Sequence, residues 1–125
     1  MQGPKELSEL KELEMMQPKF NLWIEKDGVV VLSAWRVALL ETIEATGSIS
    51  AAAEKLNIPY RRAWEKVQEI EEGLGVKVVD TAVGGKGGGG AHLTSAGRKA
   101  IEQFRQFSAG FDAEIIQRYR EAFGK

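Results

Sequence analysis

The sequence has 125 residues, 43% of them hydrophobic, which is enough for one domain with a single buried core. It contains no cysteine, so disulfides, thiolate zinc sites and cysteine nucleophiles are excluded. A net charge of −1 gives no overall attraction to nucleic acid, and no apolar run is long enough to span a bilayer, so we expect a cytoplasmic protein without a membrane partner.

The first residues predict a short helix followed by a β-hairpin. Leucines spaced three apart place residues 5–16 on an amphipathic helix, and Pro18 ends it. The β-forming runs 20–24 and 29–32 flank an Asp-Gly pair at 27–28, and both residues of this pair tolerate positive φ. We therefore expect an N-terminal helical segment, residues 1–18, and a two-stranded hairpin after it.

The next part of the chain predicts two helices joined by a tight turn. Ser33 is expected to cap the first helix, which runs to Thr46 before Gly47 supplies a left-handed residue. Either Ser48 or Ser50 is expected to cap the second helix. The inward side chains are predicted to be Leu39, Leu40 and Ile43 in the first helix and Ile49, Ala52, Ala53 and Leu56 in the second.

A third helix is expected to follow at once, with Asn57 as its cap and Pro59 as its first residue. Three helices with such short connections, the second of them rich in alanine, are typical of a helix-turn-helix unit. The inward side of the third helix is predicted to hold Ala63, Val67, Ile70 and Leu74.

The pattern after Gly75 changes from helical to alternating. Residues 76–81 alternate as in a strand, residues 83–90 are rich in glycine, and residues 91–93 form a second short strand. A strand, a glycine loop and a strand directly after a third helix predict the wing of a winged helix-turn-helix domain. We expect this domain to span residues 19–95.

A long terminal helix is expected at residues 96–125, capped by Thr94 and with a break considered at 108–110. Its apolar side chains exceed what one small domain can cover, so we expect it to pair with the same helix of a second copy. The alternative is that it folds back on its own hairpin. The predicted dimerisation residues are Phe104, Phe111, Ile115, Tyr119 and Phe123.

The exposed side of the third helix is the strongest candidate for a DNA-binding site. At 3.6 residues per turn, Arg61, Glu65 and Gln68 lie opposite the inward side, with aromatic and basic residues on the flanks. Arginine and glutamine carry donors that match guanine and adenine edges, whereas Glu65 repels phosphate unless it accepts from cytosine. An ordinary amphipathic surface helix would have the same pattern, and residues 48–99 hold only eight basic residues against six acidic ones.

The glycine-rich run at 84–90 does not predict a nucleotide site. Gly85, Gly87 and Gly90 satisfy G-x-G-x-x-G, but a strand follows where a dinucleotide-binding unit needs a helix, and the P-loop spacing fails. We expect a loop whose Lys86 reaches a phosphate, and the alternative is a plain flexible turn.

No catalytic or metal site is expected. His92 is the only histidine, and the sequence offers no cysteine or second histidine to complete a transition-metal site. No Ser/His/Asp set or converging pair of carboxylates is evident, and Glu69, Glu71 and Glu72 are interpreted as a solvated helix end. We therefore expect a protein that is not an enzyme and that holds no metal or other cofactor.

Four segments resemble the N-terminal DNA-binding domain of the ModE family of molybdate-responsive regulators. They are residues 47–53 (GSISAAA), 59–64 (PYRRAW), 84–91 (GGKGGGGA) and 93–97 (LTSAG). The resemblance implies a LysR-like winged helix, dimerisation through the terminal helix, and operator binding by the third helix and the wing. It also implies DNA contacts by Ser50, Tyr60, Arg61, Arg62, Lys66 and Lys86.

Two features depart from the family pattern. Pro59 stands where the family often has serine, which removes a hydroxyl and an N–H that could reach phosphate. The sequence ends at Lys125, whereas family members continue into oxyanion-binding domains that sense molybdate, so we expect this chain not to bind molybdate.

We therefore predict a mainly α fold with small β content, namely a winged helix-turn-helix with an N-terminal β-hairpin and a long C-terminal dimerisation helix. The predicted function is that of a homodimeric transcription regulator that binds inverted repeats in double-stranded DNA, linked to molybdenum metabolism by the resemblance alone. The alternative is a winged-helix protein-interaction module, which the net charge of −1 favours. The predicted DNA-binding residues are Ser50, Tyr60, Arg61, Arg62, Trp64, Lys66, Gln68 and Lys86.

Overall fold

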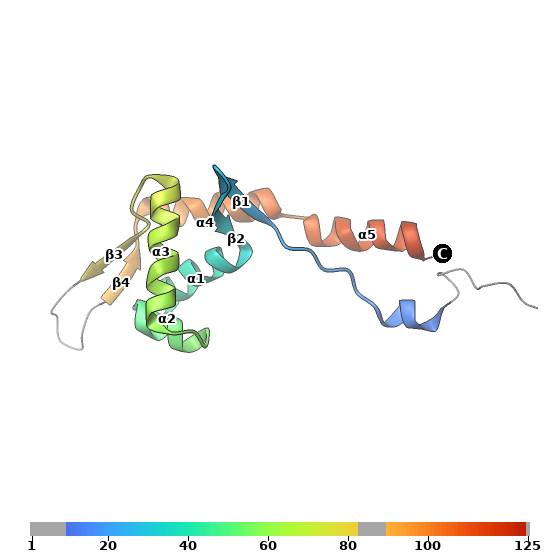
Figure 1. Ribbon diagram of the computed structural model, residues 1–125, viewed down its shortest axis with the longest axis horizontal. Coiled ribbons are helices and arrows are strands. Elements are labelled where there is room, and N and C mark those ends of the chain that lie inside the picture. Colours follow the sequence, from blue (N-terminus) through green and yellow to red (C-terminus); the bar gives the residue numbers. More distant parts are fainter. Residues whose placement is uncertain (1–9, 83–89, 125) are drawn as a thin grey trace, which may run out of the picture. The chain divides into compact units, whose positions relative to one another are not determined.

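The computed structural model describes residues 10–82 and 90–124. The chain divides into two compact units. The larger unit is Leu22–Phe107, and the smaller one combines the residues up to Asn21 with those from Ser108 onward. In the larger unit, helix α3 stands between two hairpins, β1–β2 and β3–β4 (Figure 1). The predicted winged helix-turn-helix fold is confirmed.

The first hairpin pairs β1 (Trp23–Lys26) with β2 (Val29–Ser33). Asp27 and Gly28 both have positive φ, 52° and 81°, which is the backbone of the two-residue turn that Asp-Gly favours. The predicted hairpin is confirmed, but its first strand begins at Trp23 rather than at residue 20.

Two helices follow, α1 (Ala34–Thr46) and α2 (Ile49–Lys55), each capped by a serine. The Ser33 hydroxyl accepts from the Arg36 N–H at 3.1 Å, and the Ser48 hydroxyl accepts from the Ala51 N–H at 2.9 Å. Ser48, and not Ser50, is therefore the cap of α2. Helix α1 begins and ends where the sequence predicts, and α2 begins where it predicts. These ends were predictable because the serine caps and the left-handed Gly47 are local signals.

The start of α3 (Tyr60–Leu74) differs from the prediction. Asn57 does not cap the helix: it lies in the preceding turn with φ of 58°, and asparagine tolerates this left-handed conformation better than most residues. Pro59 occupies the cap position, and no side chain caps the helix. At the other end, Leu74 is 38% exposed rather than inward, since the last turn extends past the core.

The core of the larger unit lies between the three helices and the two hairpins. It includes Leu39, Leu40 and Ile43 of α1, Ala52 and Ala53 of α2, Ala63, Val67 and Ile70 of α3, the strand residues Val31, Val79 and Leu93, and Val78 just before β3.

Helix α4 (Ser95–Ser108) packs on this core, which corrects one predicted role. Phe104 is 2% exposed and belongs to the core cluster, so its side chain is not available to a second copy. A Cβ on Gly97 would lie 2.3 Å from the Val78 carbonyl oxygen, so only glycine allows α4 to approach the strand so closely. The Thr94 hydroxyl accepts from the Gly97 N–H at 3.0 Å, as expected of the predicted cap. The helix up to Phe107 therefore belongs with the winged domain, whereas the sequence predicts a boundary at residue 96.

The wing pairs β3 (Val79–Ala82) with β4 (Gly90–Leu93) in an antiparallel register. Val79 lies opposite Leu93, and both are buried, whereas the next pair, Asp80 and His92, is exposed. The two predicted strands are confirmed, although the first begins at Val79 rather than at residue 76. The predicted glycine loop between them lies outside the described residues, apart from Gly90. The predicted contact residue Lys86 lies outside the described residues.

The smaller unit holds a 3-10 helix, η2 (Lys11–Met15), and helix α5 (Phe111–Phe123). The described part of the predicted amphipathic helix at 5–16 is thus a single tight 3-10 segment. Gly110, with φ of 84°, interrupts the terminal helix at the predicted break. Phe20 and Phe111 meet edge to face at 6.4 Å, and the Tyr119 hydroxyl donates to the Leu13 carbonyl at 3.1 Å. Helix α5 therefore finds partners within its own chain.

Candidate nucleic-acid interface

The first turn of α3 carries a group of exposed aromatic and basic side chains. Tyr60 is 55% exposed and Trp64 is 45% exposed, and Arg61 and Arg62 lie between them in the sequence and are also exposed. The opposite side of the helix is buried in the core, and this burial fixes which side chains of α3 face outward. The structure thus brings together Tyr60, Arg61, Arg62 and Trp64 on the surface of one helix, which we call the outer side of α3.

Arg61 is paired with Glu65 one turn further along the outer side. The Arg61 Nε lies 3.1 Å from Glu65 Oε1, and both side chains are exposed. An exposed pair of this kind contributes only about 0.3–0.5 kcal/mol. Arg61 can therefore leave Glu65 for a base or phosphate at little cost. The Glu65 carboxylate, which repels phosphate, is thus a weaker argument against DNA binding at this surface.

The backbone at the start of α3 also favours an anion. The first intrahelical bonds to the Pro59 carbonyl come from the N–H groups of Arg62 and Ala63, at 3.0 and 3.2 Å. No side chain caps the helix, and the N-terminus of a helix carries a partial positive charge. The partial positive charge at this end of α3 therefore adds to the charges of Arg61 and Arg62.

The other predicted DNA-binding residues lie elsewhere or are less accessible. Ser50 is exposed in the first turn of α2, and Gln68 is half-buried on α3. Lys66 is also half-buried, and its ammonium group lies 3.4 Å from each carboxylate oxygen of Glu69. Lys66 is therefore engaged within the protein.

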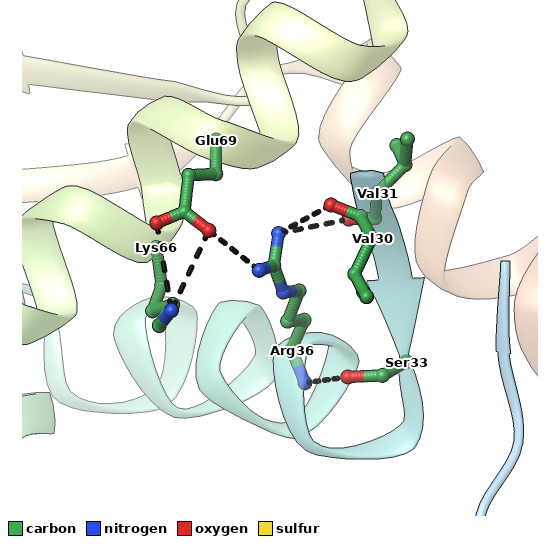
Figure 2. Close-up of polar contacts among 6 residues, drawn as sticks. All are labelled: Val30, Val31, Ser33, Arg36, Lys66 and Glu69. Carbon is green, nitrogen blue, oxygen red and sulfur yellow. Dashed lines mark hydrogen bonds and ion pairs between the residues drawn. The ribbon is translucent and has the colours of Figure 1, made fainter. Parts of the chain in front are cut away.

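Behind α3 lies an ion pair that the sequence analysis missed. Arg36 of α1 is 7% exposed, and its guanidinium donates to Glu69 at 2.6 Å and to the carbonyl oxygens of Val30 and Val31 at 3.0 and 3.5 Å. Figure 2 shows the guanidinium between strand β2 and α3, with Lys66 on the far side of the Glu69 carboxylate. Burial raises the pKa of Glu69, but Arg36 and Lys66 outweigh it and hold the pKa below its usual value.

A sequence signal for this ion pair existed. Arg36 falls on the same helical stripe as Leu40 and Ile43, at spacings of four and seven, so a charge interrupts an otherwise apolar face. A buried charge needs a partner, and Glu69 is not the solvated residue that we expected. The sequence could not name this partner, because it lies 33 residues away.

The base of the wing is bound to α3 through Glu71. Its carboxylate accepts from the N–H groups of Val78 and Val79, at 2.8 and 3.2 Å. Glu71 is therefore also not part of a solvated helix end. The two bonds tie the first residue of β3 and the residue before it to the helix that carries the outer side.

The second wing strand is bound to α1 through Glu44. Its carboxylate accepts from the Leu93 N–H at 2.6 Å and lies 3.3 Å from Arg98. The bond from Leu93 is the main reason why the pKa of Glu44 lies below its usual value; burial opposes it, and Arg98 and His92 add to it. The Ala91 N–H also donates to the Gly47 carbonyl at 2.8 Å. Both strands of the wing are thus held at their bases by hydrogen bonds to the side chains of Glu71 and Glu44.

Residues 36–98 match the family model of bacterial regulatory helix-turn-helix proteins of the lysR family. This range runs from Arg36 through α3 and the wing to the first turn of α4. The chain belongs to this family. The predicted LysR-like helix-turn-helix is thereby confirmed.

Curated relatives of this lysR-family chain are similar over about 90 residues. The molybdenum-pterin-binding protein MopB of Rhodobacter capsulatus is 49% identical over 91 residues, which are 73% of this chain and 33% of MopB. The transcriptional regulator ModE of Yersinia pestis is 44% identical over 71% of this chain and 34% of its own length. The dual regulator ModE of Escherichia coli K12 is 35% identical over the same shares. The chain thus spans about a third of the length of these relatives, and the predicted resemblance to the N-terminal domain of ModE is confirmed.

Within residues 10–82 and 90–124, no three His, Cys, Asp or Glu side chains are grouped so that they could hold a metal ion. No helix in the same ranges is both long and apolar enough to cross a bilayer.

Proposed function

We propose that this chain is the DNA-binding part of a bacterial transcription regulator and that it inserts α3 into the major groove of double-stranded DNA. The observation that carries the proposal is the outer side of α3, where Tyr60, Arg61, Arg62 and Trp64 are exposed on a helix whose opposite side is buried. A helix of this kind, presented beside a wing, is how helix-turn-helix proteins contact base edges.

The residues of the interface have different proposed roles. Arg61 reads a guanine edge and Gln68 reads an adenine edge, since their donors match these bases. Tyr60, Arg62, Ser50 and Lys86 bind phosphate oxygens and fix the position of the domain. We assign Trp64 an apolar contact with the methyl group of thymine, because its indole is exposed beside the basic residues.

The proposed regulator acts in the cytoplasm on genes of molybdenum metabolism. This part of the proposal is supported by the names of the relatives, among them a transcriptional regulator ModE and a molybdenum-pterin-binding protein. We expect the 125-residue chain itself not to bind molybdate, and calorimetric titration with molybdate tests this expectation directly.

The proposed regulator binds DNA as a homodimer that pairs through α5. Ile116 and Phe123 remain exposed although α5 contacts Phe20 and Leu13 of its own chain. Covering several such side chains on each copy would offset the several kcal/mol that association costs. Charged substitutions at Phe111 and Ile115 should therefore give monomers with weaker operator binding, and sedimentation showing an unmodified chain that is monomeric at micromolar concentration would remove the dimer.

A protein-interaction module is the second candidate, and one observation favours it. Trp23, Ile24 and Val29 of the first hairpin and Trp35 at the start of α1 are large apolar side chains that remain exposed. Large apolar side chains that remain exposed are typical of protein contacts when they form a patch. If this candidate holds, substitutions of these residues should abolish partner binding and leave any DNA affinity unchanged.

The deciding experiment is in vitro selection from a random pool of duplexes with the 125-residue chain. The proposal predicts enrichment of one motif with inverted half-sites, bound much more tightly than a scrambled duplex and more weakly as salt increases. A pool that remains random after repeated selection at low salt would contradict the proposal and favour the second candidate.

A further inference from the structure

We propose that Arg36 and Glu69 are positioning residues for DNA recognition, which set the rotation of α3 about its axis and thereby decide which of its side chains reach the bases. This inference rests on the proposed DNA-binding function and assigns a role in it to residues that touch no DNA. It concerns the flank of α3 that faces β2, which we call its inner side and which carries Glu69 and Gly73 in the later turns, after the exposed Arg62 on the same helical stripe.

One guanidinium joins three elements at this place. Arg36 belongs to α1, its carbonyl acceptors Val30 and Val31 belong to β2, and its carboxylate acceptor Glu69 belongs to α3 (Figure 2). The guanidinium is planar and its donors have fixed directions, so it determines where each acceptor lies more strictly than an ammonium group would. The position of Glu69, and with it the rotation of α3, therefore depends on Arg36.

A second contact fixes the same side of the helix. A Cβ on Gly73, one turn after Glu69, would lie 2.6 and 2.7 Å from the two γ-carbons of Val31. The α3 backbone at Gly73 thus packs directly against the Val31 side chain of β2. Glu69 and Gly73 together hold the inner side of α3 against strand β2 over one helical turn.

Small rotations of α3 matter because the outer side reads bases at hydrogen-bond distance. With side chains, an α-helix has a radius of about 5–6 Å, so a rotation of about 20° moves a side-chain tip by about 2 Å. A hydrogen bond to a base edge does not survive such a displacement. Phosphate contacts by flexible basic side chains are much more tolerant, since they carry no sequence information.

Stability alone does not explain the ion pair. A buried pair of charges contributes little compared with apolar residues of similar volume, because desolvation offsets the attraction. The carboxylate of Glu69 is also a negative charge on a helix that must approach phosphates. Two cations, Arg36 and Lys66, surround it at 2.6 and 3.4 Å. The pair is consistent with a geometric role, in which a directed bond matters more than net charge.

The test compares Glu69→Ala with Glu72→Ala, which removes the same side chain from an exposed position on the same helix. For each folded variant of the 125-residue chain, the affinity for the duplex that the unmodified chain selects is divided by the affinity for a scrambled duplex. We expect Glu69→Ala to lower this ratio about tenfold, as for the loss of one base contact, while binding of the scrambled duplex stays unchanged or improves. Glu72→Ala should keep the ratio within about twofold, the scatter usual for a surface change. Glu69→Gln, which keeps an acceptor for Arg36, should restore most of the ratio.

A second pair of variants tests the contact with β2 independently of charge. Gly73→Ala places a methyl group against Val31 and should push α3 away from the strand, which lowers the same ratio about tenfold. Adding Val31→Ala removes both γ-carbons and should recover part of the loss. If Glu69→Ala does not fold, the Gly73 variants decide the question.

The outcomes separate this inference from the proposed function. An unmodified chain that does not distinguish the two duplexes contradicts both. A chain that distinguishes them, with Glu69→Ala and Gly73→Ala keeping the ratio within about twofold, contradicts only the positioning role. Equal losses on both duplexes would mean that Glu69 is merely structural, and this too overturns the inference.

Discussion

The ion pair between Arg61 and Glu65 on the outer side of α3 and the pair between Arg36 and Glu69 on its inner side have lengths of 3.1 and 2.6 Å and very different surroundings. The side chain of Arg61 is 89% exposed, whereas that of Arg36 is 8% exposed. Water replaces a lost partner at the exposed site but not at the buried one. The outer arginine is therefore free to exchange Glu65 for DNA, and the inner arginine holds the helix in place.

Loss of the inner pair should have the largest effect. Arg36→Ala leaves Glu69 with Lys66 alone and removes the Arg36 donor from two carbonyl oxygens, and we expect the free energy of unfolding to fall by about 2–3 kcal/mol. This is less than for a fully buried pair, because Glu69 is partly exposed. Urea denaturation measures the change, with Arg62→Ala as the exposed control, expected within about 0.5 kcal/mol of the unmodified chain. If the two variants have the same free energy of unfolding, the inner pair contributes no more to stability than an exposed side chain does.

The outer arginine should matter for binding rather than for stability. Arg61→Ala is expected to cost about 1–3 kcal/mol on the selected duplex and less on random DNA, since a base contact is lost. Lys86→Ala should weaken binding to both duplexes equally, because a phosphate contact is not sequence-specific. Fluorescence anisotropy at fixed salt measures both. If neither variant changes binding to any duplex at low salt, this surface of α3 is not the DNA-binding site.

Acid should affect the inner pair selectively. The pKa of Glu69 is lowered in the folded protein, so its contribution to stability is complete above the ordinary value of 4.5 and disappears as the pH falls through the lowered pKa. Glu69→Gln lacks this contribution, and its stability should decline less steeply than that of the unmodified chain below about pH 4.5. Glu65→Gln serves as the control with a carboxylate from the outer pair. Parallel curves for Glu69→Gln and the unmodified chain would contradict the lowered pKa.

The smallest effect is expected for the acidic partner of the outer pair. Glu65→Gln should change the free energy of unfolding by no more than about 0.5 kcal/mol, because an exposed pair one helical turn apart contributes little. It should also bind any duplex slightly more tightly, since one negative charge near phosphate is removed. A clear loss of sequence preference in this variant would instead assign Glu65 a direct contact with cytosine.

Local features of the fold were predictable from the sequence, and long-range ones were not. The Asp-Gly turn at 27–28, the Ser33 cap and the break at Gly110 depend on neighbouring residues and lie where we expected them. Phe104 shows the limit: helical spacing indicates an apolar stripe but not whether the same domain or a second copy covers it.

The same limit applies to the candidate site. Spacing along one helix was sufficient to predict that Arg61 and Glu65 lie opposite the buried side, although Gln68, predicted beside them, is half-buried. It was not sufficient for Glu69 and Glu71, because their partners, Arg36 and the residues at the start of β3, are brought to α3 only by the fold. From the sequence alone, charged residues near the end of a helix are therefore predicted to be solvated, even where the folded protein uses them to bind other elements.

The three tryptophans of the chain offer the most direct test of the central claim, that DNA binds the outer side of α3. Trp64 lies on this surface, whereas Trp23 lies on β1 and Trp35 at the start of α1. In NMR spectra of the ¹⁵N-labelled chain, each indole N–H gives its own signal. Titration with the selected duplex should shift the signal of Trp64 and leave those of Trp23 and Trp35 nearly unchanged. A shift at Trp23 or Trp35 with an unchanged Trp64 would contradict the account.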